Sequence, residues 1–76
     1  MPRAPRITGA EAVRALRRLG WREAYQKGSH IVLVHPDRPQ KRVVVPLHPG
    51  RILKAGTLAA ILDRAGLDVE EFRRVL

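Results

Sequence analysis

The chain has 76 residues, 45% of them hydrophobic, which suits one small folded domain across residues 1–76 and leaves no room for a second core. It has no cysteine, which excludes disulfides, thiolate zinc sites and cysteine nucleophiles. Its formal net charge of +8 favours an anionic partner, of which nucleic acid is the most general. Residues 1–54 hold twelve of the fifteen lysines and arginines but three of the seven acids, giving +9 against −1 in residues 55–76.

No export or membrane segment is visible in the sequence. Residues 1–6 lack the apolar centre of a signal peptide, and no stretch approaches the ~20 apolar residues of a membrane span. We therefore expect a cytoplasmic protein with no membrane partner.

The first element expected along the chain is a helix that begins after Thr8. Thr8 and Glu11 have the spacing of a capping box, and apolar residues then recur on one helical face until Gly20 supplies a left-handed stop. The opposite face carries three arginines that either solvate the helix or form a ridge facing RNA phosphates: Arg14, Arg17 and Arg18.

Three strands are expected next, and their short connections favour an antiparallel meander. The first covers residues 21–25, and Lys27–Gly28 forms the turn into a second strand over residues 29–35. A proline-bounded loop, residues 36–40, precedes a third strand over residues 41–45, which Pro46 ends.

The remainder is predicted to be mainly helical. After a loop over residues 47–56, Thr57 caps a helix that closes at Gly66, and a box-like start at Asp68 begins a short final helix. The order α-β-β-β-α indicates an α+β fold with two helices on one face of a three-stranded antiparallel sheet. Such a layout can leave the other face of the sheet open.

His30 is the candidate catalytic residue. It stands between the small residues Gly28 and Ser29 and the apolar run over residues 31–34, so a rigid strand holds an imidazole that can exchange a proton near neutrality. If Ile31 and Leu33 face the helices, alternation places His30 on the opposite face, close to Lys27 and across from Lys41 and Arg42.

Metal-free RNA cleavage fits these residues, because the 2′-hydroxyl is the nucleophile and the protein only moves protons and stabilises charge. One positioned acid–base group contributes roughly 10²–10⁴-fold to the rate. In this interpretation the lysines and Arg42 hold phosphates, and the amides of Gly28 and Ser29 donate to them. Two alternatives stay open: His30 only caps its strand, or the basic face belongs to a non-catalytic double-stranded-RNA-binding module.

Other chemistries fit less well. The histidines His30, His35 and His48 lack the spacing of a metal site, so we expect neither a metal nor another cofactor. A serine triad is disfavoured, because Ser29 points away from its neighbour His30. His35 is expected to be structural or exposed, and His48, near Arg51, to lie close to a bound phosphate. Direct DNA binding ranks last, because three strands separate the two main helices.

Four short motifs occur in order along the chain: Leu16–Trp21, Gln26–His30, Val43–His48, and Lys54–Leu58 followed by Ala65–Leu67. Together they resemble HicA toxins, the small mRNA interferases of HicA–HicB toxin–antitoxin modules, from about Thr8 to Phe72. The resemblance implies a double-stranded-RNA-binding-like fold, ribonuclease activity on mRNA and neutralisation by a HicB-type antitoxin. It also implies that His30 is the catalytic histidine and that His48 lies beside the site. An acidic antitoxin that covers His30 is the simplest expectation, with docking on residues 55–76 as the alternative.

Overall fold

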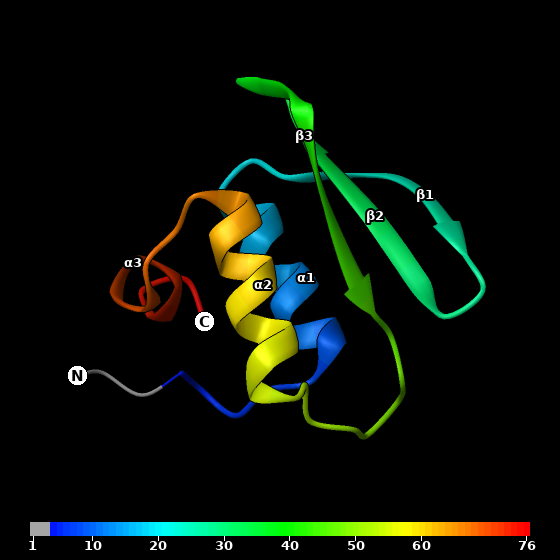
Figure 1. Cartoon of the computed structure of the whole chain (residues 1–76), viewed down its shortest axis with the longest axis vertical. Helices are drawn as coiled ribbons and strands as arrows, with labels where there is room; N and C mark the ends of the chain where they lie inside the picture. The colour runs from blue at the N-terminus through cyan, green and yellow to red at the C-terminus, as the bar shows by residue number, and fades with distance from the viewer. Residues whose placement is uncertain (1–3) are drawn as a thin grey trace.

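The computed structural model describes residues 4–76 (Figure 1), so Met1–Arg3, part of the segment on which the export prediction rested, lie outside the described residues. Helices pack against one side of a three-stranded antiparallel sheet of order β1-β2-β3, which confirms the predicted α+β layout. No helix in this described part is long and apolar enough to cross a membrane. The elements are α1 (Gly9–Arg18), β1 (Arg22–Lys27), β2 (His30–His35), β3 (Arg38–Pro46), α2 (Ala55–Ala65) and α3 (Val69–Arg73).

The core lies between the helices and one face of β2 and β3. Ile31 and Leu33 on β2 pair with Val45 and Val43 on β3, and all four side chains are buried in one cluster. Since side chains alternate along a strand, this pairing fixes which residues face the helices and which face away. The helices contribute mainly Ala12, Leu16, Leu58, Ile61, Leu62 and Phe72 to the same cluster.

The two predicted capping boxes are both present. Thr8 accepts a hydrogen bond from the Glu11 amide, and the Glu11 carboxylate accepts from the Thr8 amide in return. Asp68 and Glu71 make the same reciprocal pair at the start of α3. The hydrogen bond from the Thr8 amide, followed by that from the Thr8 hydroxyl, lowers the pKa of Glu11.

The sequence placed the start of the third strand wrongly. β3 begins at Arg38 rather than at residue 41, because Pro36–Asp37 alone form the turn after β2 and His35 pairs with Arg38. Pro39 lies within β3, which is an edge strand, and a proline that lacks an amide hydrogen is tolerated there.

The predicted limits of β1 and α2 also differ from the structure. β1 runs over Arg22–Lys27, and Trp21 is a buried core side chain just before it. α2 begins at Ala55 with Lys54 as its N-cap, although no side chain caps its first turn. Thr57 therefore lies inside the helix and is not its cap; the Lys54 carbonyl accepts the helical hydrogen bond from Leu58.

Candidate functional site

The face of the sheet opposite the helices carries His30. His30 is the first residue of β2, is exposed, and pairs with Lys27 on β1 and Pro46 on β3. Directly paired residues of antiparallel strands share a face, so these three side chains form one row across the sheet. We call the surface on this side of the three strands the open face.

Two further rows complete the open face. Tyr25, Val32 and Val44 form the middle row, in which Val32 is buried although it does not belong to the core cluster between sheet and helices. Beyond it, Val34 pairs with a cation on each side, namely Arg22 on β1 and Arg42 on β3. The open face therefore has an apolar centre, His30 and Lys27 near one end, and two arginines at the other.

The charge of the open face has one sign. Within the three described strands the one acidic residue is Glu23, which pairs with the core residue Leu33 and so lies on the helix side. There its carboxylate accepts from Arg17 of α1 at 3.2 Å. The strands thus direct three cations and His30, but no carboxylate, toward the open face.

The turn before His30 is tied to the end of β3. Gly28 and Ser29 form the turn, with Gly28 exposed in the left-handed region at a φ of 58°. The Leu47 amide donates to the Ser29 carbonyl at 2.5 Å, which extends the β2–β3 ladder beyond His30. His30 is therefore held by backbone pairing on both sides.

His48 lies one residue beyond this ladder, in the loop before α2. A surface hollow there is lined by Pro46, His48, Arg51 and Lys54, so the loop adds cations next to the residue that pairs with His30. His48 and Arg51 are exposed. The structure thus brings His48 near the His30 end of the open face, together with Arg51.

The structure separates Lys41 and Arg42, which the sequence placed together across from His30. Arg42 is on the open face but pairs with Val34, about 13 Å along β3 from Pro46. Lys41 follows the alternation of Val43 to the helix side. That placement was wrong because His30 begins β2 and so meets the far end of β3 in an antiparallel pair.

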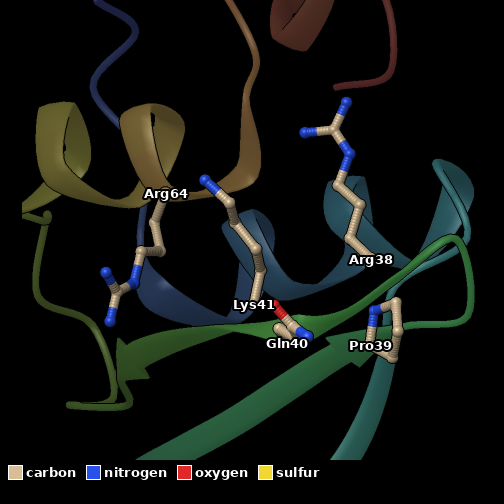
Figure 2. Close-up of a pocket in the computed structure, with 5 residues that line it drawn as sticks. All are labelled: Arg38, Pro39, Gln40, Lys41 and Arg64. Atoms are coloured by element: carbon tan, nitrogen blue, oxygen red, sulfur yellow. The ribbon is translucent and has the colours of Figure 1, made fainter.

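Figure 2 shows where Lys41 lies instead. The side chains of Arg38 and Lys41 extend from β3 toward α2, and Arg64 extends from α2 back toward the strand; all three line one surface hollow. Arg38 donates to the Ala65 carbonyl at 2.8 Å, and Arg64 donates to the Arg42 carbonyl at 3.2 Å. This second cationic surface is on the other side of the sheet from His30.

The arginine ridge of α1 is also on the helix side. Arg14, Arg17 and Arg18 are exposed, but two of them make contacts within the chain. Arg17 pairs with Glu23, and the Arg18 guanidinium donates to the Val75 carbonyl at 2.5 Å. The structure does not bring these arginines to the open face.

His35 has a structural role at the other end of β2. Its Nδ1 accepts from the Asp37 amide at 3.1 Å, so Nε2 carries the hydrogen that it donates to the Leu19 carbonyl at 2.9 Å. Its ring meets Trp21 edge-on, with ring centroids 5.3 Å apart. Among residues 4–76, no three His, Asp or Glu side chains gather as metal ligands would.

Sequence reasoning missed Tyr25 and Arg22 on the open face. Tyr25 could have been found from the sequence, because it stands two residues before Lys27 and so shares the face of Lys27. Arg22 could not have been found in this way, because the pairing of β1 with β2 shifts by one residue between Glu23 and Tyr25 and leaves Ala24 as a bulge. A bulge reverses the alternation of side chains between the two faces of the sheet, and no residue in Arg22–Lys27 indicates that a bulge is present.

One comparison with known proteins is informative. A family model described as the HicA toxin of bacterial toxin–antitoxin systems matches residues 9–67, from the start of α1 to just beyond α2. Among curated proteins, none matches the chain. The matched span contains the whole open face, including the Gly28–His30 motif and His48.

Proposed function

The chain belongs to the HicA toxin family of bacterial toxin–antitoxin systems, and on that premise we propose that it is an endoribonuclease that cleaves mRNA with His30 as its general acid–base. The observation that carries this proposal is the placement of an exposed imidazole on a sheet face that has cations and no carboxylate. Such a face attracts a polyanion and presents it with a group able to move protons.

The proposed reaction needs no metal ion. His30 takes the proton of a ribose 2′-hydroxyl as that oxygen bonds to the adjacent phosphorus, and the bond from phosphorus to the 5′-oxygen breaks. The imidazolium then returns the proton to the leaving 5′-oxygen, so one fragment ends in a cyclic 2′,3′-phosphate and the other in a 5′-hydroxyl. Lys27 is in the same row as His30 and stabilises the charge that builds on the phosphate oxygens.

The remaining cations differ in their proposed roles. The backbone amides of the exposed Gly28 and the half-buried Ser29 lie beside His30, as does the loop carrying His48, so they hold the phosphates nearest to the cleaved bond. Arg42 binds a phosphate farther along the open face. Lys41 and the arginines Arg14, Arg17 and Arg18 are on the helix side, where they act as a wider docking surface for RNA.

The family places this toxin in a module with an antitoxin, and we propose a HicB-type protein as that partner. An acidic partner that covers His30 would neutralise the toxin by excluding RNA from the open face. An antitoxin that docks on residues 55–76 instead would leave His30 exposed in the complex. We propose that the cytoplasm, where mRNA is available, is the site of action.

The test is incubation of a long RNA with purified wild-type protein and with His30→Ala, in EDTA, followed by a denaturing gel and analysis of the fragment ends. Wild type is expected to cleave and to leave cyclic phosphates, and His30→Ala to lose cleavage but keep its fold, since His30 is exposed. His48→Ala is the matched comparator and is expected to weaken binding without abolishing cleavage. Undiminished cleavage by His30→Ala would end the assignment. RNA that wild type binds but leaves intact would indicate a non-catalytic RNA-binding module.

A further inference from the structure

We propose that Tyr25 is a nucleobase-binding residue, and that the open face takes an unpaired nucleotide of single-stranded RNA with its base stacked on the Tyr25 ring. The identity of the polymer as RNA rests on the function proposed above, whereas the stacking itself does not depend on cleavage. A double-stranded RNA would use the same cations but would leave this ring without a base.

The position of Tyr25 relative to His30 supports the proposal. Tyr25 pairs with Val32, and His30 is two residues from Val32 on the same face, so Tyr25 and His30 are diagonal neighbours. Diagonal neighbours across antiparallel strands are about 7–8 Å apart, within reach of an aromatic side chain. That separation is on the scale of the span from a base to the phosphate of its own nucleotide. A base on Tyr25 therefore leaves an adjoining phosphate at His30.

The exposure of the ring also needs an explanation. Tyr25 is 48% exposed, and every residue of β1 is exposed, so about half of the surface of this aromatic residue is left uncovered by the described chain. With Val32 and Val44 (itself 48% exposed) it forms an apolar strip across the middle of the face. An aromatic ring on an apolar strip is the platform on which unpaired bases stack, whichever base is present.

The cations around the strip point to a nucleic-acid strand as the occupant. Lys27 is at one end of β1, and Arg22 and Arg42 flank Val34 at the other end of the face. A protein surface that stacks bases and tracks a phosphate backbone combines these same two features. The base faces of a duplex are hidden in its stack, so only an unpaired strand satisfies both the ring and the cations.

The test measures binding apart from cleavage, in the His30→Ala background. A short single-stranded RNA with one 2-aminopurine reports affinity, and quenching of its fluorescence reports stacking. Tyr25→Leu is expected to weaken binding about 5- to 150-fold and to remove the quenching that the protein causes, because one base–aromatic stack is lost. Tyr25→Phe keeps the ring and is expected to bind like the parent. Leu76→Ala, which removes an equally exposed apolar side chain at the C-terminus, is the matched control.

Each of four results would overturn the proposal. One is equal affinity of Tyr25→Leu and its parent for the single-stranded RNA. Another is a loss of affinity in Tyr25→Phe as large as that in Tyr25→Leu, which would assign the effect to the hydroxyl group. The third is an equal loss of affinity for the same sequence as a duplex. If Tyr25→Leu binds RNA normally but loses an antitoxin, the strip is a protein interface and the proposal is wrong. Cleavage by wild type is scored separately, so loss of the stacking proposal leaves the nuclease assignment standing, and the reverse also holds.

Discussion

A methyl group at Gly9 is expected to disturb the strand that pairs with His30. Gly9 is the buried first residue of α1, and a Cβ there would overlap the carbonyl oxygen of Pro46 and lie 3.1 Å from its carbonyl carbon. The obstacle is backbone, which cannot rotate away as a side chain can. Because Pro46 pairs with His30, the helix or the end of β3 has to shift beside the proposed catalytic residue.

The expected loss of stability for Gly9→Ala is about 1–3 kcal/mol, typical of an added methyl in a closely packed position. In a domain of this size each kcal/mol lowers Tm by about 4–8 °C, so a thermal melt by circular dichroism resolves the change. The same variant is expected to cleave RNA more slowly than its remaining folded fraction predicts, because the pairing of Pro46 with His30 is displaced.

Gly56→Ala is the matched control for Gly9→Ala. Gly56 is also near the start of its helix, its φ is not positive, and no atom lies within 4 Å of a Cβ built there. Alanine favours the helix, so Gly56→Ala is expected to raise stability by up to about 1 kcal/mol. A Gly9→Ala protein as stable and as active as wild type would refute the reasoning, because the Pro46 contact would then tolerate a methyl group.

The capping box makes stability depend on pH, because the hydrogen bonds from Thr8 lower the pKa of Glu11 in the folded state. The stabilisation that Glu11 contributes is complete above the ordinary glutamate range and is lost as pH falls through the lowered pKa. Thermal melts of Glu11→Gln should therefore lack this loss of stability on the acid side. Phe72→Ala, which empties a fully buried site beneath α3, should lower the free energy of unfolding in urea by about 3–5 kcal/mol. Arg22→Gln and Arg42→Gln should each reduce the slope of log affinity for single-stranded RNA against log salt by about 0.7, whereas Arg74→Gln, away from the open face, should leave it unchanged.

Features that depend on a few neighbouring residues could be predicted from the sequence. The Thr8–Glu11 capping box and the left-handed Gly66 were predicted correctly because their chemistry is local. The placement of His30 was conditional on Ile31 and Leu33 facing the helices, and the structure meets that condition because both side chains lie in the core cluster. His30 followed from the same alternation, and its exposure in the structure agrees with that placement.

The arrangement between strands could not be predicted in the same way. Which residue faces His30 depends on the β2–β3 register, which the Pro36–Asp37 turn sets together with a shift of the pairing between Val34 and His35. The predicted position of Lys41 was wrong because His30 is the first residue of β2 and therefore pairs with Pro46 at the far end of β3. The Ala24 bulge, which brings Arg22 to the open face, arises from pairing with β2 and leaves no mark in the composition of β1.

The two sides of the His30 row are supported very differently. On one side, β1 is exposed along its whole length and is joined to the helix layer by the exposed Arg17–Glu23 pair, an interaction that adds little stability. On the other side, Pro46 lies against Gly9, and the Leu47 amide bonds to Ser29. The position of His30 therefore depends on β3 and α1, while β1 supplies Lys27 and Tyr25 from a strand without core packing. Substitutions that loosen the contact between Gly9 and Pro46 should accordingly slow cleavage, whereas those on β1, apart from Lys27, should act mainly on RNA affinity.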